Sequence, residues 1–232
     1  MKRKNDAHPL TGEESPLMKH LFTLGASTIP GEYIIPRLLS AMIRHLPEIE
    51  LKVEISDSLK VFEAVRAGQY EIGIIGTRYE SPDVDFSIIV KDDRLVLITP
   101  RNHRLAVKGP IALNDLKGHD FVSREHGSGT QAAFEKTFRD AGLAMTDLNV
   151  VATVGSTEGI IQAVECGAGI AVVSELAARE AIEQGKVRVL DIPLIKMVRD
   201  FLIITRKGAS LSTDALEVLA VIRMVMKEGP PH

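Results

Sequence analysis

Hydroxyl side chains, one glycine and one arginine gather where short apolar strands give way to helices. The members of this set are Ser27, Thr28, Thr77, Arg124, Ser128, Gly129, Thr130 and Ser156. The first turn of a helix presents free N–H groups and the positive end of the helix dipole, and both favour anions. Hydroxyls add donors, glycines let the backbone approach a ligand closely, and a guanidinium can pair with an anion. The set therefore favours the binding of a small anion or carboxylate.

A purely structural interpretation of the same residues stays open. Serine is a common N-cap, so Ser27, Ser128 and Ser156 can simply cap helices. Arg124 can form a surface ion pair with its neighbour Glu125.

Other chemistries find no support in the sequence. The stretch 127–129 lacks the Gly-x-Ser-x-Gly pattern of a nucleophile elbow, and Gly-x-Gly-x-x-Gly does not occur. The seven histidines include no pair with metal-ligand spacing on an expected helix. We therefore expect no catalytic residues, no metal and no cofactor. The single cysteine, Cys166, excludes an intramolecular disulfide, and we expect it to be a buried thiol on the apolar side of its helix.

The elements that position these residues recur along the chain. Ala64, Val65 and Gly68 repeat as Ala163, Val164 and Gly167, which is an offset of 99 residues. Two pairs of candidate helix starts, Ser56 with Ser156 and Ser27 with Ser128, have offsets of 100 and 101. A repeat of this length predicts two similar α/β halves, and in open α/β sheets ligands bind at the carboxyl ends of the strands. The hydroxyl-bearing turns should therefore line a cleft between two lobes.

Hydrophobic periodicity and turn residues predict the individual elements. Strands are expected at 21–25, 49–55, 71–75, 84–90, 95–99, 121–124, 148–154, 170–173, 187–192 and 199–205, with residues 91–94 as a solvated turn. Helices are expected at 32–46, 58–67, 156–166, 128–141, 176–184 and 213–227, and residues 1–19 as a flexible lead-in. The helix at 32–46 carries a wide apolar stripe, which invites burial against a neighbouring element or a second subunit.

Composition limits the class of protein. The 232 residues are 45% hydrophobic, enough for one large or two smaller domains. A net charge of −3 disfavours a nucleic-acid-binding surface on this chain. The sequence contains neither a run of about 20 apolar residues nor a secretory signal, so we expect no membrane contact and a cytoplasmic location.

An ordered set of motifs resembles the effector-binding domain of LysR-type transcriptional regulators. The set comprises GASTIPGEY at 25–33, Pro36, Pro47, Ser56-Asp57, the Val65–Ile74 pattern, REHGSGT at 124–130 and AVECGAGI at 163–170. The resemblance covers roughly residues 20–228 and implies a two-lobed fold like that of type 2 periplasmic binding proteins. Two Rossmann-like lobes would be joined by two crossover strands, with lobe I at 20–99 plus 206–228 and lobe II at 100–205.

The resemblance also implies a function. A small-molecule effector would bind between the lobes, touching Ser27 and Thr28 on one side and Ser128–Thr130 on the other. The helices at 32–46 and 131–141 of two copies would pair in a homodimer or higher oligomer. The family's helix-turn-helix domain is expected to be absent, because only about twenty residues precede the first strand, so DNA would be reached only through that missing part.

Two other functions fit the same scaffold. A solute-binding protein of a transporter has this fold but requires export. An enzyme on a two-lobed scaffold requires a convergent acid–base or nucleophile set.

Overall fold

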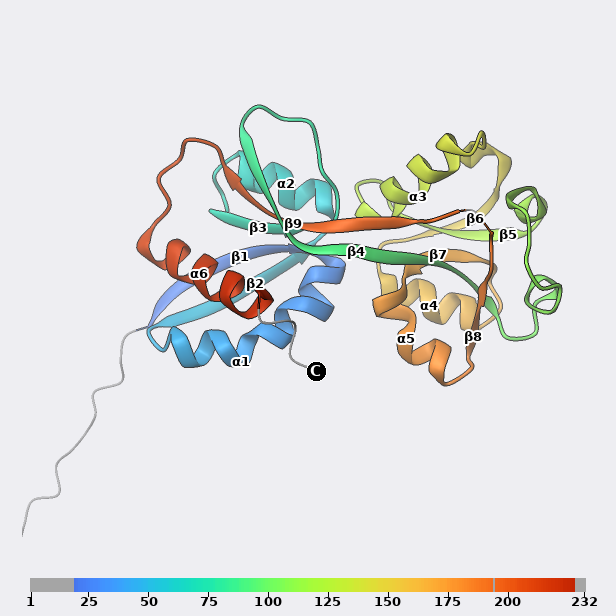
Figure 1. The fold of residues 1–232 in the computed structure, drawn as a ribbon, viewed down its shortest axis with the longest axis horizontal. Helices are drawn as coiled ribbons and strands as arrows, with labels where there is room; N and C mark the ends of the chain where they lie inside the picture. Colours follow the sequence, from blue (N-terminus) through green and yellow to red (C-terminus); the bar gives the residue numbers. More distant parts are fainter. Residues whose placement is uncertain (1–18, 194, 228–232) are drawn as a thin grey trace, which may run out of the picture.

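The structure is a computed structural model that describes residues 19–193 and 195–227, and it consists of two α/β lobes bridged by two long strands (Figure 1). One 7-stranded sheet runs through both lobes in the order β2–β1–β3–β9–β4–β7, with β8 also paired to β4. The expectation of a two-lobed α/β fold is therefore confirmed.

Lobe I is built on three parallel strands, β1 (His20–Ser27), β2 (Ile49–Ser56) and β3 (Ile72–Ile75), with β1 in the centre. Its helices are α1 (Ile35–His45), α2 (Ser58–Arg66) and α6 (Thr213–Lys227). A π-helical segment, Pro30–Ile34, leads from β1 into α1, so this helix begins earlier than its apolar periodicity indicates. The carboxyl ends of β1 and β3 both point at the second lobe.

Lobe II contains β5 (Asp120–Arg124), β6 (Asn149–Val154), β7 (Ala171–Ser174) and β8 (Val187–Leu190), and the helices α3 (Gly129–Asp140), α4 (Thr157–Glu165) and α5 (Glu175–Glu183). β5 and β6 are parallel, and a parallel bridge between Phe121 and Ile170 joins β5 to the segment that leads into β7. Every residue of β7 is buried, as its continuous apolar run predicts.

Two antiparallel crossover strands, β4 (Val84–Pro100) and β9 (Val198–Arg206), connect the lobes. β9 pairs with β3 in lobe I, and the distal end of β4 pairs with β7 and β8 in lobe II. The expected turn at 91–94 is wrong: β4 continues through it, with register shifts on either side of Val90 and a positive φ of 56° at Asp92. Asp93 is buried there because Arg199, 106 residues away, neutralises it. The lobe boundaries at 99/100 and 205/206 stay predictions.

Helix caps match the expected repeat only in part. Ser128 caps α3 and Ser156 caps α4, each by accepting a backbone N–H three residues on. The start of α2 differs, because Asp57 caps it by accepting from Lys60 N at 2.8 Å, while Ser56 is the last residue of β2.

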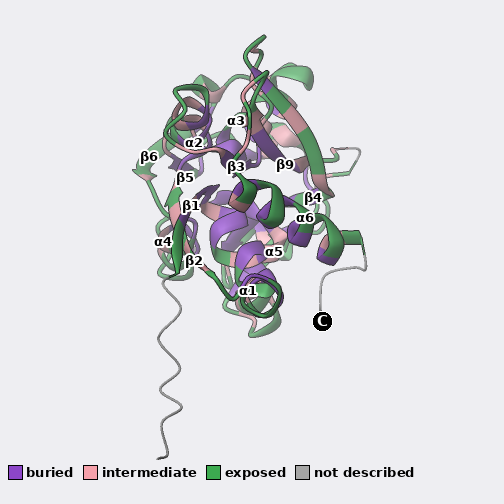
Figure 2. Ribbon diagram, turned by 90° about the vertical axis from the view of Figure 1, so that its left-hand side faces the viewer, coloured by how far each residue is buried: buried purple, intermediate pink, exposed green. Residues whose placement is uncertain are grey.

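Buried residues fill the space between sheet and helices in both lobes (Figure 2). The largest cluster crosses from one lobe to the other, with Leu24 and Leu38 in lobe I and Val96 and Ile161 in lobe II. Most of the apolar side chains on α1 are buried in this core, and Ile43 is exposed.

Cys166 is exposed, contrary to expectation, because it lies at the C-cap of α4, beyond the last buried turn. Within 19–193 and 195–227, no helix combines the length and the hydropathy that crossing a membrane requires.

Candidate functional site

The starts of three helices meet between the lobes. Ser27 ends β1 and Thr28 follows it, Ser58 opens α2, and Ser128, Gly129 and Thr130 lie at the start of α3. Together with Ile29, Asp57, Arg124 and Arg199 they line a cavity of about 10 Å³. A cavity of that size holds about one water molecule, so the lobes are closed on each other. The structure thus brings together six of the eight residues that the sequence singled out.

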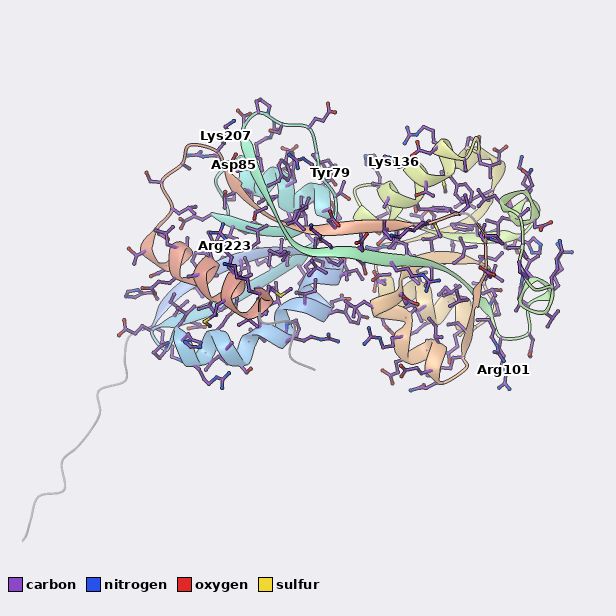
Figure 3. All side chains as sticks on the ribbon, viewed as in Figure 1. Tyr79, Asp85, Arg101, Lys136, Lys207 and Arg223 are labelled. Carbon is purple, nitrogen blue, oxygen red and sulfur yellow. The ribbon has the colours of Figure 1, made fainter. Side chains whose placement is uncertain are left out.

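Direct bonds hold this closed arrangement. Leu59 N donates to Gly127 O at 3.3 Å, and the Tyr79 hydroxyl donates to the same carbonyl at 3.4 Å. Tyr79 belongs to lobe I and faces α3 of lobe II, where Lys136 is labelled (Figure 3). Burial, with the nearby Asp57 carboxylate, raises the pKa of Tyr79 to about 12. The phenol therefore stays protonated and remains a donor across the lobes at neutral pH.

Arg124 is buried at the end of β5 and is bound by the chain's own groups. Its Nη1 donates to Thr157 Oγ1 at 2.6 Å, its Nη2 donates to Thr28 Oγ1 in the other lobe at 3.4 Å, and its Nε pairs with Glu125 at 2.8 Å. The ion pair with Glu125 exists, but it is not a surface pair because the Arg124 side chain is only 3% exposed. Arg124 thus places positive charge against the cavity and links the lobes.

Arg199 on β9 is a further member of the site that the sequence interpretation missed. Its side chain is only 7% exposed, its Nε donates to Asp93 Oδ2 at 2.9 Å, and its guanidinium lies 4.8 Å from the centre of the Phe201 ring. Burial lowers the pKa of Arg199, whereas Asp93 acts in the opposite direction. Among the described residues, Arg199 Nη2 has no hydrogen-bond partner. A buried donor left in this way costs free energy unless a ligand or water satisfies it. The residue type at a strand crossing between the lobes was the available signal.

Thr77 carries a second buried polar atom without a hydrogen-bond partner in the described structure. Its Oγ1 is buried and, like Arg199 Nη2, has no partner within the described part of the chain. Gly129 lies beside both residues: a Cβ added there would be 2.7 Å from Thr77 Oγ1, 2.8 Å from Ser58 Oγ and 3.2 Å from Arg199 Nη1. The glycine thus permits the close approach of α3 to lobe I.

Ser156 lies outside this assembly. It is exposed and its Oγ accepts a hydrogen bond from Gly159 N at 3.2 Å. The next residue, Thr157, is buried and binds Arg124 instead. Both have hydroxyls, and only the direction in which α4 leaves β6 decides which of them faces the cleft.

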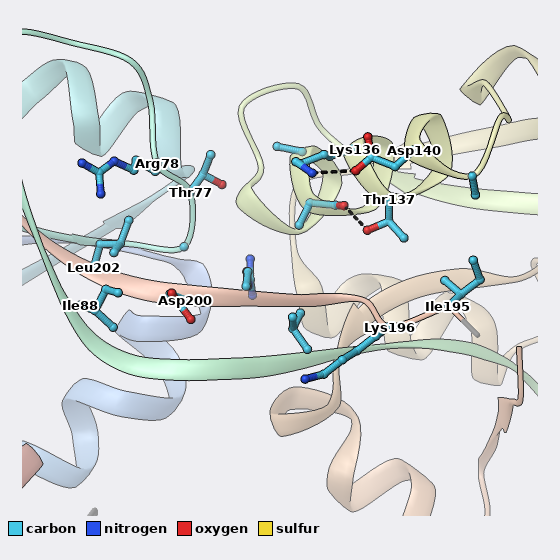
Figure 4. Close-up of a pocket in the computed structure, with 16 residues that line it drawn as sticks. Thr77, Arg78, Ile88, Lys136, Thr137, Asp140, Ile195, Lys196, Asp200 and Leu202 are labelled. Carbon is cyan, nitrogen blue, oxygen red and sulfur yellow. Dashed lines mark hydrogen bonds and ion pairs between the residues drawn. The ribbon is translucent and has the colours of Figure 1, made fainter. Parts of the chain in front are cut away.

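The cleft widens outward from Arg199 into a pocket of about 740 Å³. In Figure 4, Thr77 and Arg78 lie on one side, Lys136 and Asp140 of α3 lie on the other, and Asp200 lies on the crossover strand β9 below Thr77. Lys136 is paired with Asp140 at 2.7 Å. A ligand therefore has a route from solvent to Arg199.

The arrangement suits an anion for a physical reason. Two buried guanidiniums and three helix starts surround one small space, and Arg124 and Arg199 repel each other electrostatically. An anion between them would relieve that repulsion and satisfy Arg199 Nη2. No group of three or more His, Cys, Asp or Glu side chains in 19–193 and 195–227 is placed to hold a metal ion.

Comparison with known proteins assigns the chain to a family. Residues 17–227 match the LysR substrate binding domain. An HTH-type transcriptional regulator from Methanocaldococcus jannaschii is 38% identical over 75% of this chain, which spans 58% of that protein. A phosphonates import ATP-binding protein from Anaeromyxobacter dehalogenans is 31% identical over 90% of this chain, which spans 41% of that protein.

A solved structure agrees with the sequence matches. The regulatory domain of CcmR from Synechocystis, in complex with 2-PG, superposes with a TM-score of 0.80 at 27% identity and covers 91% of this chain and 99% of that one. The chain spans about half the length of the curated relatives named above. The match over nearly its whole length and the shared two-lobed architecture show that the chain belongs to the LysR substrate-binding domain family.

Proposed function

We propose that this chain is the effector-sensing part of a LysR-type transcriptional regulator and binds a small anion or carboxylate between its lobes. The observation that carries the proposal is the pair of buried, unsatisfied groups, Arg199 Nη2 and Thr77 Oγ1, at the start of α3. The ligand set comprises Ser27, Thr28, Thr77, Arg124, Ser128, Gly129, Thr130 and Arg199. Thr157, in place of Ser156, positions Arg124.

Binding acts through the lobe angle. A ligand shifts a conformational equilibrium only by its different affinity for the two states. An anion held by lobe I groups, by α3 and by Arg199 on the crossover strand favours one lobe arrangement over others. In a complete regulator this change is passed to DNA-binding parts, so the role is one of binding rather than catalysis, and the location is cytoplasmic.

The relatives' names support an oxyanion or a related ligand. The CcmR domain is described in complex with 2-PG, and a second relative is named for phosphonate import. A compact anion also fits a cleft whose inner end is nearly closed.

A thermal-shift screen tests the proposal. Sulfate, thiosulfate, selenate, O-acetylserine and 2-PG are added separately to the wild-type chain. A ligand at 100 times its Kd stabilises the native state by about 2.7 kcal/mol, so its midpoint rises. Arg199→Met should abolish the shift, whereas Arg223→Ala, an exposed substitution on α6, should retain it. No shift with any compound, or an equal shift in Arg199→Met, would contradict the cleft assignment.

We also infer a homodimer. Apolar side chains are exposed on lobe I, at Leu21, Ile43 and Ile55, and on the edge strand β6 of lobe II, at Val150 and Val151. Two antiparallel copies can cover both surfaces, because a C2 contact repeats each lobe I–lobe II pairing twice. We propose β6 for the lobe II half of the interface, and the pairing through the helix at 131–141 stays a prediction. Light scattering at micromolar concentration should give a dimer, and Ile43→Asp a monomer; a wild-type monomer would refute the inference.

A further inference from the structure

A second pocket lies on the other side of the crossover strands, away from the cleft. Its volume is about 310 Å³, and we call it the α1–α5 pocket after the helices on its two sides. Its lining includes Arg37 and Leu38 of α1, Leu176 and Arg179 of α5, Phe201 of β9 and Met226 of α6. In Figure 1, α1 and α5 lie on one side of β4 and β9, whereas α2 and α3 lie on the other.

The floor of the α1–α5 pocket is apolar. Leu38 and Phe201 are buried, and Tyr33, Leu176 and Met226 pack as partly buried residues against the core that crosses the lobes. Ligand sites of proteins are mostly apolar concavities with a few polar groups, and their volumes begin near 300 Å³. The pocket therefore has room for a small organic molecule with a hydrocarbon body.

The cations that border the pocket outnumber the acids that are free to pair with them. All three of its acids are already paired with cations: Asp93 with Arg199 at 2.9 Å, Glu175 with Arg94 at 3.2 Å, and Asp92 with Lys196 at 3.7 Å. Arg37, Lys91 and Arg179 are exposed and form no ion pair with any described residue. The uncommitted charge is thus positive, and it borders an apolar floor.

Both lobes contribute to this pocket. Arg37 and Met226 belong to lobe I, Leu176 and Arg179 to lobe II, and Phe201 to a crossover strand. Phe201 also stacks on the Arg199 guanidinium, whose carboxylate partner Asp93 lines the same pocket. A molecule here would therefore contact both lobes and Phe201, the ring that stacks on the arginine at the inner end of the cleft.

We propose that the α1–α5 pocket is a second ligand site for an amphipathic monocarboxylate, with the hydrocarbon body on the apolar floor and the carboxylate between Arg37 and Arg179. Carboxylates pair strongly with guanidiniums, and a neutral molecule of the same shape lacks that interaction. Because the ligand spans the lobes, it is a second input to the lobe angle. The site is distinct from the cleft and does not depend on the identity of the cleft ligand.

Octanoate is the probe, measured by isothermal titration calorimetry on the whole chain, with octanamide as the uncharged control. Octanoate should bind with one site per chain, and octanamide at least about tenfold more weakly. Arg37→Ala and Arg179→Ala should each weaken octanoate by about fivefold to tenfold. The control Arg223→Ala, an exposed arginine on α6 outside the pocket (Figure 3), should leave its affinity unchanged.

A filled pocket gives a second test. Met226→Trp places a larger side chain on the apolar floor and should abolish octanoate binding, whereas Met224→Trp, on the exposed side of the same helix, should not. Circular dichroism shows whether each variant is folded. If Met226→Trp is unfolded, Arg37→Ala and Arg179→Ala test the proposal instead. Arg199→Met combined with Asp93→Asn, which leaves no unpaired charge in the pocket wall, should lose the cleft ligand and still bind octanoate, which separates this proposal from the previous one. Absence of octanoate binding, equal binding of octanamide, or insensitivity to Arg37→Ala and Arg179→Ala would overturn it.

Discussion

Replacing Gly129 by alanine tests the closure of the cleft with a single methyl group. Gly129 lies in the first turn of α3 and is not among the positive-φ glycines, so alanine is acceptable to its backbone. The added Cβ would be 2.7 Å from Thr77 Oγ1 and 2.8 Å from Ser58 Oγ, both in lobe I. Ordinary contact begins at 3.4 Å, so we expect α3 and lobe I to separate by about 0.7 Å.

Gly129→Ala should affect the free energy of unfolding and the affinity for the cleft ligand in different directions. Alanine in place of glycine in a helix stabilises by up to about 1 kcal/mol, and the lobes relieve the clash by opening. The free energy of unfolding should therefore stay the same or rise. Affinity for the cleft ligand should fall by about tenfold, because apparent affinity scales with the population of the binding-competent state.

Urea unfolding and calorimetric titration of the ligand found in the screen measure the two effects. Gly155→Ala is the matched control: no atom lies within 4 Å of its added Cβ and its φ is not positive, so it should change neither quantity. Unchanged ligand affinity in Gly129→Ala would refute the closure of α3 on lobe I. A fall in stability of several kcal/mol would show that the lobes cannot open to relieve the clash.

Three further predictions follow from single side chains. Arg199→Met should lower the free energy of unfolding by about 3–5 kcal/mol because it leaves Asp93 buried and unpaired, and adding Asp93→Asn should restore most of the stability in urea titrations without restoring ligand binding; equal stability of both variants would argue against the pair. The pKa of Tyr79 is raised, so its contribution is complete below pH 10 and is lost as the pH rises towards about 12; unfolding measured across this range should show a decline that Tyr79→Phe reduces, and an identical decline in that variant would assign it elsewhere. Cys166 is exposed, so the folded chain should react with one equivalent of Ellman's reagent as fast as a small thiol does, and a reaction that waits for denaturant would contradict its placement.

Much of the fold follows from local patterns. The apolar runs and the glycine stops predict nearly every strand and helix, because these signals lie within a few residues of the elements they define. The same is true of the caps at Ser128 and Ser156, since a cap bonds to a backbone group three residues away. The two-lobed arrangement followed from the order of the elements and their repetition.

The errors and omissions involve contacts between distant parts of the chain. Residues 91–94 read as a solvated turn because their charges were considered without Arg199, whose side chain makes it possible to bury Asp93. For Arg199 the only signal was its position on a crossover strand, because its partner Asp93 lies 106 residues away. The choice between Ser156 and Thr157 depends on how α4 leaves its strand, and the exposure of Cys166 depends on where that helix ends. Each of these properties is fixed by tertiary packing.

The position of β9 has a consequence for synthesis on the ribosome. In lobe I, β9 lies between β3 and β4, although it is synthesised about a hundred residues after the end of β4 and later still after β3. The strands β5 to β8 and the end of β4, by contrast, form a nearly continuous stretch that emerges earlier. Vectorial translation therefore lets the second lobe fold first. In the first lobe, β3 and β4 lack the strand that lies between them until β9, in the last quarter of the chain, has been synthesised.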